Sequence, residues 1–319
     1  MMRGIFAMTG VALAACAAAA APSDYHLIPG QVTPNKGPDG NSIFLDTKDG
    51  LVLVDTGRHP DHRDKLLAYA RERGRPVIAI FNTHWHLDHT TGNAEIRAAY
   101  PRARVYATGA IEGALTGFFP KSRKGAEEFL KSGKASPQQQ AEIKRGFYVM
   151  DHPETLRASD LVTAGRTMTI GGRKLEVHVA PFAATEADLW LYDPKARLAI
   201  VGDLVVGLVP FMDTACPEGW RKALDQVGKA PFVTLIPGHG EPMTRAQFLQ
   251  WKMAFSTFVD CGRSAKPAAE CVAGWEKDAA PFIDEAHRAY VRQAADYYLK
   301  TRLRSSSAEQ EKYCKPLAA

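Results

Sequence analysis

Three histidines and one carboxylate lie within six consecutive residues of this chain, in the segment H-W-H-L-D-H from His84 to His89. In an extended backbone, side chains two residues apart point to the same side, so His84 and His86 can share one metal ion. If the chain then enters a helix near Leu87, Asp88 and His89 face a neighbouring position and can hold a second ion. Imidazole together with carboxylate suits Zn²⁺ better than a hard cation. The segment therefore predicts a zinc site, with a solvated polar turn as the competing interpretation.

Three further polar motifs stand where apolar segments that predict strands come to an end. V-D-T-G contains Asp55, G-D contains Asp203, and P-G-H-G contains His239. The strands predicted at or before them are Leu51–Val54, Leu198–Val201 and Phe232–Ile236. Taken singly, either aspartate could be a turn or cap residue, and His239 a surface histidine between glycines. Their joint order along the chain makes them candidate site residues.

Together with H-W-H-L-D-H, these motifs resemble in type and order those of the metallo-β-lactamase fold superfamily, over most of residues 40–245. The resemblance implies an α/β fold of the αββα sandwich type, with a centre for two Zn²⁺ ions at the top of the sheets. It also implies a role for each residue. His84 and His86 would bind the first metal, Asp88, His89 and His239 the second, Asp203 would lie between the two, and Asp55 would hold the ligand-bearing loops by hydrogen bonds.

One position departs from this pattern. Most members carry a third histidine for the first metal in a segment like H-T-x-x-D-L, and here that position holds Ala184, which cannot bind metal. Glu186, two residues further on, is the candidate replacement, because a glutamate binds the metal at the comparable place in the alkylsulfatase branch of the family. Alternatively, Glu186 is a solvated loop carboxylate or a group that contacts the substrate. His178 is a weaker candidate, because it alternates with Glu176 along a predicted strand and fits an ordinary strand residue. Without a replacement, the first site would bind metal less tightly.

The resemblance implies hydrolysis by a hydroxide held between the metals, because bound Zn²⁺ lowers the pKa of water towards about 7. Asp88 would orient this nucleophile or return a proton to the leaving group. The substrate would be a small molecule with an ester, lactone, amide, phosphoester or sulfoester bond. Asp188–Asp193 and Gly202–Val206 are also similar to the zinc metallohydrolases of periplasmic quinoprotein systems. One alternative is a non-catalytic metal-binding or assembly protein, which Ala184 favours. The other is a β-lactamase. Asp203 is evidence against it, since this bridging carboxylate is typical of glyoxalase II-like members.

Several apolar residues near these motifs are candidates for the walls of a substrate pocket. Trp85 stands inside the ligand motif, and Phe118 and Phe119 precede a charged, helix-prone stretch. Pro210–Asp213 follows Asp203 closely and offers Phe211, with a loop packed on the core as the competing interpretation.

The elements that must position these residues follow an α/β order. Further strands are predicted over Ser42–Asp46, Pro76–Phe81, Arg104–Ala107, Thr167–Ile170, Leu175–Ala180 and Asp188–Tyr192, and helices over His62–Arg73, Gly219–Val227, Thr244–Phe258 and Pro281–Leu303. Residues 22–42 predict an irregular lead-in, and residues 121–148 a helical insertion that overhangs the site. We expect one domain over residues 22–319, with a C-terminal helical extension from about residue 245.

The first 21 residues have the pattern of a secretory signal. Arg3 lies in a short leading segment, and Ile5–Ala15 is apolar but too short to cross a bilayer. Leu13–Cys16 resembles the lipobox of bacterial lipoproteins, in which the cysteine is lipidated; plain cleavage within Ala17–Ala21 is the alternative. Both interpretations place the folded domain in the periplasm or on the outer face of a bacterial membrane.

Four cysteines remain beyond Cys16, an even number that predicts disulfides in an exported protein. Cys261 with Cys271 is the most local pairing, because the nine residues between them, G-R-S-A-K-P-A-A-E, look like a loop after a helix. Cys216 would then pair with Cys314 and tie the C-terminal tail to the domain. Free thiols or zinc ligands are the alternatives, although no C-x-x-C spacing supports a thiolate site.

The composition is that of an ordinary globular protein. The 319 residues are 45% hydrophobic and 24% charged, with a mean hydropathy of −0.23, which excludes a disordered chain and a polytopic membrane protein. The net charge of +5 is spread along the chain without a basic cluster, so nucleic acid is not an expected partner. The expected partners are a small-molecule substrate and, through a lipid on Cys16, a membrane surface. The oligomeric state does not follow from the sequence.

Overall fold

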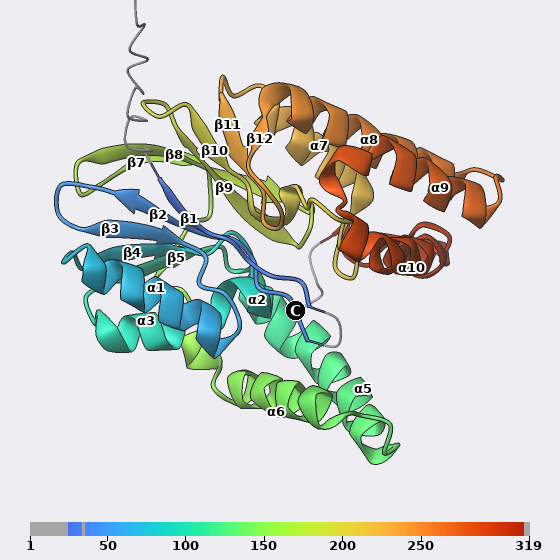
Figure 1. Cartoon of the computed structure of the whole chain (residues 1–319), viewed down its shortest axis with the longest axis horizontal. Coiled ribbons are helices and arrows are strands. Elements are labelled where there is room, and N and C mark those ends of the chain that lie inside the picture. The colour runs from blue at the N-terminus through green and yellow to red at the C-terminus, as the bar shows by residue number, and fades with distance from the viewer. Residues whose placement is uncertain (1–24, 34–35, 316–319) are drawn as a thin grey trace, which may run out of the picture.

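The computed structural model describes residues 25–33 and 36–315, so the predicted signal segment 1–21 and Cys16 lie outside the described residues. Two six-stranded sheets face each other, and helices cover their outer sides (Figure 1). The α/β fold of the αββα type is therefore confirmed. Within the described ranges, no helix is both long and apolar enough to cross a bilayer.

The first sheet carries the motif-bearing strands of the first half of the chain. Its strands, in spatial order, are β1 (His26–Ile28), β2 (Ser42–Asp46), β3 (Leu51–Val54), β4 (Val77–Phe81), β5 (Arg104–Ala107) and β6 (Asp160–Leu161). The strands from β3 to β6 run parallel, and all four residues of β3 are buried, as its continuous apolar run predicts. The prediction of an irregular lead-in over residues 22–42 is wrong at β1, which pairs with β2. Three residues are too few to show an alternating pattern.

The second sheet carries the late motifs. Its spatial order is β12 (Met243–Thr244), β11 (Thr234–Ile236), β10 (Leu198–Ile200), β9 (Ala187–Asp193), β8 (Arg173–Pro181) and β7 (Arg166–Ile170). β10 and β11 are parallel neighbours, whereas the other pairs are antiparallel. Apolar side chains of the two sheets form one buried layer between them, which includes Leu45, Val52, Val54, Leu175, Val177, Leu189 and Leu191.

Helices pack outside each sheet and extend beyond the sandwich (Figure 1). The α-helices are α1 (Pro60–Glu72), α2 (Leu87–Thr90), α3 (Asn93–Ala99), α4 (Ala110–Gly113), α5 (Phe119–Lys131), α6 (Pro137–Asp151), α7 (Pro217–Val227), α8 (Arg245–Arg263), α9 (Ala268–Asp278), α10 (Arg288–Tyr298) and α11 (Ser307–Glu311). Residues 121–148 lie within α5, α6 and their connection. A capping box of Ser136 with Gln139 starts α6, so the second helix of this pair has its own N-terminal signal in the sequence.

Two predictions for the C-terminal part, one of a helix and one of a loop, need correction. The single helix predicted over Pro281–Leu303 is broken, because short 3-10 turns at Ala280–Phe282 and Glu285–His287 precede α10. Asp284 lies between them in an extended conformation and accepts a hydrogen bond from the backbone of His287, which starts a new turn. The loop predicted after Cys261 is shorter than expected, since α9 begins at Ala268.

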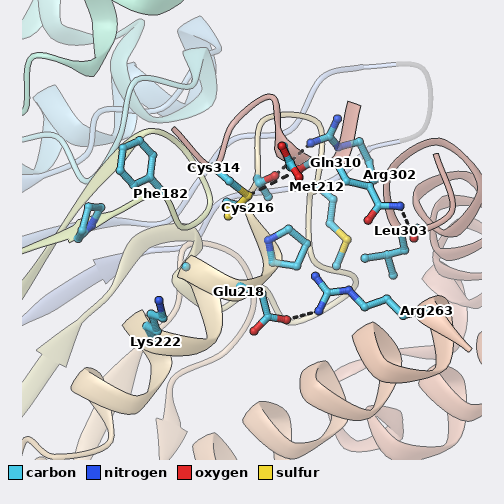
Figure 2. A pocket seen from close by; sticks show the side chains of 15 residues that line it. Phe182, Met212, Cys216, Glu218, Lys222, Arg263, Arg302, Leu303, Gln310 and Cys314 are labelled. Atoms are coloured by element: carbon cyan, nitrogen blue, oxygen red, sulfur yellow. Dashed lines mark hydrogen bonds and ion pairs between the residues drawn. A yellow bond between two sulfur atoms is a disulfide. The ribbon is translucent and has the colours of Figure 1, made fainter. Parts of the chain in front are cut away.

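Both predicted disulfides are confirmed. Cys216 bonds to Cys314 across 98 residues of sequence, and Cys261 bonds to Cys271 across 10. The first bond lies beside a hollow of about 500 Å³ (Figure 2). An ion pair between Arg263 and Glu218 also lines this hollow, whereas none of the histidines of the sequence motifs does.

Candidate metal centre

The four sequence motifs follow four strands that end at the same side of the sandwich. Asp55 follows β3, the segment from His84 to His89 follows β4, Asp203 follows β10 and His239 follows β11. β3 and β4 are parallel neighbours, as are β10 and β11, so their carboxyl ends meet at one edge of each sheet. Motifs far apart in the sequence therefore converge.

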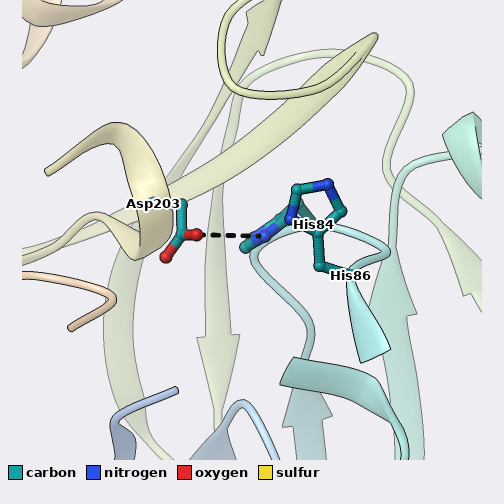
Figure 3. Close-up of side chains that lie close together, drawn as sticks. All are labelled: His84, His86 and Asp203. Carbon is teal, nitrogen blue, oxygen red and sulfur yellow. Dashed lines mark ion pairs between the residues drawn. The ribbon is translucent and has the colours of Figure 1, made fainter. Parts of the chain in front are cut away.

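The converging side chains form two groups, and the donor atoms within each lie within 4.8 Å of one another. The groups are His84, His86 and Asp203, shown in Figure 3, and Asp88, His89 and His239. Asp203 faces both of them. Its Oδ2 lies 3.7 Å from Nε2 of His84, while its Oδ1 lies 3.2 Å from Nε2 of His89 and 3.4 Å from Nε2 of His239. This is the placement that a carboxylate between two cations requires.

Asp55 sets the orientation of two of the imidazoles. Its Oδ2 lies 2.8 Å from Nδ1 of His89 and 2.7 Å from the hydroxyl of Thr83, and its Oδ1 accepts the backbone N–H of Thr83. Because the Thr83 hydroxyl donates to Asp55, it accepts from Nδ1–H of His84 at 3.0 Å. When each ring carries its single proton on Nδ1, its Nε2 faces Asp203 and can bind a metal. Asp55 itself has a φ of 58°, a left-handed conformation that aspartate tolerates better than most residues.

His86 is oriented by a residue that the sequence analysis did not identify. The hydroxyl of Thr214 donates to the carbonyl of Ala184 at 3.0 Å and lies 2.9 Å from Nε2 of His86. It therefore accepts from Nε2–H, which leaves Nδ1 of His86 as the ring atom that could bind a metal. A threonine 128 residues away from its partner has no spacing or motif that could reveal this role.

Close backbone approach explains two glycines around the centre. A Cβ on Gly238 would lie 2.0 Å from Oδ1 of Asp203, and one on Gly40 would lie 2.3 Å from the ring of His89. Asn41, also missed from the sequence, holds the loop around His239: its side-chain amide donates to the carbonyls of residues 237 and 240 at 2.9 and 2.8 Å. Larger residues at either glycine would push a donor atom out of place.

The unsatisfied polar atoms of the centre fit metal ligation. Nε2 of His84 and both carboxylate oxygens of Asp203 are buried without a hydrogen-bond partner. Burial, together with the neighbouring His89 and His86, holds the pKa of His84 well below its ordinary value. Burial acts to raise the pKa of Asp203, but three surrounding histidines hold it far below its usual range. Neutral imidazole beside ionised carboxylate is the donor set of a transition-metal site.

Glu186 lies outside both groups. Its Oε2 accepts a hydrogen bond from the indole N–H of Trp85 at 2.8 Å, and its Oε1 is buried without a partner. Burial raises the pKa of this carboxyl group. Ala184 is fully buried and offers no donor, and His178 is not brought to the centre: it stacks on Trp190 with ring centroids 3.9 Å apart.

A pocket of about 460 Å³ opens beside the centre. His86 and Asp88 line one part of it, and four aromatic residues expected near the entrance, Trp85, Phe118, Phe119 and Phe211, line it as well. Met212 next to Phe211 is fully buried in the core, so the loop contributes both to the pocket and to the packing. The volume lies within the ordinary range of small-molecule sites.

A buried histidine joins the α5–α6 pair to the rim of the centre. His59 is fully buried, with Nδ1 2.7 Å from Oδ2 of Asp39 and Nε2 2.9 Å from Oε2 of Glu142 on α6. Burial raises the pKa of Asp39, but hydrogen bonds from His59 and Arg58 outweigh it and lower that pKa to about 2. Next to it, the Arg58 guanidinium lies 3.9 Å from Oδ1 of Asp88.

Comparisons with known proteins agree with this geometry. A linear primary-alkylsulfatase from Pseudomonas sp. is 25% identical over 222 residues, which cover 63% of this chain and 41% of that protein. A hydroxyacylglutathione hydrolase from Synechococcus sp. is 27% identical over 178 residues, which cover 56% of this chain and 54% of that one. The chain thus matches about half of the length of these relatives.

A solved structure and a family model extend the comparison. A metallo-beta-lactamase family protein from Thermus thermophilus aligns with a TM-score of 0.59 and 18% identity over 87% of this chain and 93% of the other, which shows a shared fold. The family model described as the metallo-beta-lactamase superfamily matches residues 36–239, the range that contains Asp55 and every candidate metal ligand. The chain therefore belongs to the metallo-beta-lactamase superfamily.

Proposed function

We propose that this chain is an exported, zinc-dependent hydrolase that cleaves an ester, lactone, amide, phosphoester or sulfoester bond in a small molecule. The observation that carries the proposal is Asp203, whose two oxygens point to two separate groups of metal-ligand type and have no hydrogen-bond partner. Two relatives, an alkylsulfatase and a hydroxyacylglutathione hydrolase, support a hydrolytic reaction.

Each residue of the centre has a role in this proposal. His84, His86 and Asp203 would hold the first Zn²⁺, and Asp88, His89, His239 and Asp203 the second. Two bound cations supply Lewis acidity and lower the pKa of a water molecule towards about 7. Asp88 lines the pocket, so its carboxylate is placed to accept a hydrogen bond from that water and to return the proton to the leaving group. Burial acts to raise the pKa of Asp88, but His89, the hydrogen bond with His239 and the Arg58 guanidinium hold it well below its usual range, so Asp88 stays ionised.

Glu186 is proposed as the third protein ligand of the first metal. Its Oε1, which has no hydrogen-bond partner, supports this role, since a bound cation would compensate the free-energy cost of burying a carboxylate oxygen. Because Glu186 lies outside both groups, binding would require its side chain to shift beside the indole of Trp85, so zinc titration should change the tryptophan fluorescence. We expect Glu186→Gln to lower the zinc content from about two ions per chain to about one, by elemental analysis. An unchanged content would show that Glu186 is a pocket residue and not a ligand.

The central test of the function is metal-dependent turnover. We expect 4-nitrophenyl acetate hydrolysis to be lost on chelation, restored by zinc, and reduced at least 100-fold by Asp88→Asn, with Asp49→Asn in an exposed turn as the matched control. Wild-type turnover in Asp88→Asn would remove Asp88 from the mechanism. One zinc ion or fewer per chain, without turnover of any ester, lactone, amide, phosphoester or sulfoester, would favour the metal-binding or assembly protein that Ala184 suggests. Rapid nitrocefin hydrolysis would instead indicate a β-lactamase.

Export and lipidation of Cys16 are part of the same proposal. The signal-like residues 1–21 support them, and so do the two disulfides, because such bonds persist in oxidising compartments. Mass spectrometry of the mature N-terminus tests both points. A diacylglyceryl group on Cys16 that is absent from Cys16→Ser is the expected result, and a free N-terminus between residues 17 and 22 would show plain signal cleavage.

A further inference from the structure

The pocket beside the metal centre points to the substrate class. We propose that it accepts molecules with an apolar, uncharged body whose single oxygen-rich or anionic group is the one presented to the metals. This inference rests on the proposed function for the cleavage step, but it concerns the shape and charge of the pocket, which can be tested separately.

Three elements far apart in the sequence supply the walls. Trp85 and Leu87 come from the ligand segment between β4 and α2, and Tyr290 and Tyr298 come from one face of α10 in the C-terminal extension. The largest share comes from the α5–α6 pair and the turn before it. Its lining side chains are Phe118, Phe119, Ala126, Ile143, Phe147 and Met150.

Ring contacts join the aromatic side chains of this lining to the ligand segment. The ring of Trp85 lies 5.2 Å from that of Phe118 and 5.3 Å from that of Phe119, in tilted and edge-on contacts. Phe211 lies next to the second group of metal-ligand type, with its ring 5.3 Å from the ring of His239. The apolar surface therefore begins at the metal-ligand residues and leads away from them, so a substrate must bury apolar groups to bring its reacting group to the centre.

The charged side chains in the walls are few, and the carboxylates among them already have hydrogen-bond partners within the protein. Apart from the metal groups, the ionised residues that line the pocket are Arg58, Glu142 and Asp213. Glu142 accepts a hydrogen bond from Arg145 and lies 2.9 Å from Nε2 of His59, and Asp213 accepts the hydroxyl proton of Tyr298 at 2.9 Å.

The distribution of charge therefore excludes a second substrate anion. The one cation among the described lining residues, Arg58, lies 3.9 Å from Oδ1 of Asp88, at the metal end of the pocket. Elsewhere a substrate anion would meet carboxylates and aromatic rings, with no lysine in the described part of the lining. A buried charge without a partner is costly, so a substrate with an anionic tail is rejected.

A binding experiment on the zinc-loaded full chain tests this class directly. N-phenyl-1-naphthylamine, an uncharged fluorescent probe, should bind and be displaced by octanoate. Octanedioate has the same chain length and differs by a carboxylate at the far end, so we expect it to displace the probe at a concentration at least tenfold higher. Acetate, which has the head group alone, should displace it at a concentration at least a hundredfold higher than octanoate.

Variants locate the binding in this pocket. Phe118→Ala and Phe147→Ala, both at half-buried positions, should weaken probe binding at least fivefold, and Phe118→Leu should restore most of it. The matched control is Tyr148→Ala, because Tyr148 neighbours Phe147 on α6 but is 65% exposed and does not line the pocket. Thermal unfolding of each variant shows whether it is folded.

The outcomes separate this inference from the proposed function. Equal displacement by octanoate and octanedioate, or probe binding that the two phenylalanine variants leave unchanged, would overturn the inference even if zinc-dependent esterase activity is found. Selective probe binding without turnover of any ester, lactone, amide, phosphoester or sulfoester would support the pocket's chemistry and refute the hydrolase. For an active enzyme, kcat/KM should be at least tenfold higher for 4-nitrophenyl octanoate than for the acetate, and a higher value for the acetate would contradict the proposed substrate class.

Discussion

At the scale of single residues, the centre depends on carboxylates and hydroxyls that hold imidazoles as well as on the candidate ligands. Asp55 fixes His89 directly and His84 through Thr83, and Thr214 fixes His86. Each contact selects one tautomer of a ring and thereby decides which nitrogen is available to a metal.

Removal of the Asp55 charge should weaken metal binding without unfolding the chain. Asparagine tolerates the positive φ of this position and nearly matches aspartate in shape, but its amide cannot accept every hydrogen bond that the carboxylate accepts. We expect Asp55→Asn to reduce zinc affinity by about 10- to 100-fold in a titration against a chromophoric chelator. Asp49→Asn should leave the affinity unchanged. Wild-type affinity in Asp55→Asn would show that the rings are held by packing alone.

His62 should give the protein a pH-dependent stability. Burial lowers its pKa from 6.5 to about 4, and its Nε2 lies 2.9 Å from the hydroxyl of Ser42. Between these two pH values the unfolded chain binds a proton at His62 that the native protein does not bind. The free energy of unfolding should therefore fall as the pH drops through this range, by up to about 3 kcal/mol.

Denaturant unfolding of the metal-free protein between pH 4 and 7 measures this effect. In His62→Gln the contribution of this group is absent, so the difference in unfolding free energy between variant and wild type should change with pH. A pH-independent difference would mean that His62 is protonated to the same degree in the folded and unfolded states.

At the scale of elements, the C-terminal helices hold the segment that follows Asp203. Buried tryptophans on α7, α8 and α9 each donate an indole N–H to a backbone carbonyl in that segment. The bonds join Trp220 to Leu204, Trp251 to Val206 and Trp275 to Leu208, at 2.9, 2.7 and 3.2 Å. Alternate carbonyls of one stretch are thus fixed by three consecutive helices, and the helical extension serves the metal centre as well as the core.

Loss of one of these bonds should affect both stability and metal binding. Trp251→Phe keeps most of the buried ring but leaves the carbonyl of Val206 without its partner, which costs about 1 to 3 kcal/mol. We expect lower stability in urea and a weaker zinc affinity, because Asp203 is then less firmly placed. Met253→Ala, at a 65% exposed position of the same helix, should change neither property. A loss of stability with unchanged zinc affinity would show that the C-terminal helices stabilise the fold without affecting metal binding at the centre.

At the scale of the whole molecule, the two disulfides close loops of different size. Cys216–Cys314 spans 98 residues and joins the tail beyond α11 to the start of α7, close in sequence to Thr214, whereas Cys261–Cys271 spans 10. Because a longer loop loses more entropy on closure in the unfolded chain, the first bond should stabilise the native state more.

Paired serine variants compare the two bonds. Replacement of Cys216 and Cys314 should cost about 4 kcal/mol of unfolding free energy, and replacement of Cys261 and Cys271 clearly less. Urea unfolding of both variants measures the costs. An equal cost would show that local packing, rather than loop length, decides their contributions.

Several features of this protein could be predicted from local sequence. Continuous apolar runs predicted β3 and β4, and the histidine-rich segment predicted the metal groups, because ligands close in sequence share a face of a strand or turn. Both disulfide pairs were also predicted. Short strands such as β1 and β6 were not predicted, since two or three residues show no hydrophobic period. Hydrophobic spacing predicted one continuous helix over Pro281–Leu303, whereas Asp284 starts a new turn within it.

The sequence by itself determined the residue types of the centre and the strands that bring them to one edge, because those signals lie within a few neighbouring positions. Only the tertiary structure decided that Thr214 orients His86, that Trp85 holds Glu186, and that α6 and α10 close an apolar pocket beside the centre. These contacts join segments far apart in the chain. Such pairs leave no local period, and their identity depends on how the two sheets and the outer helices pack together.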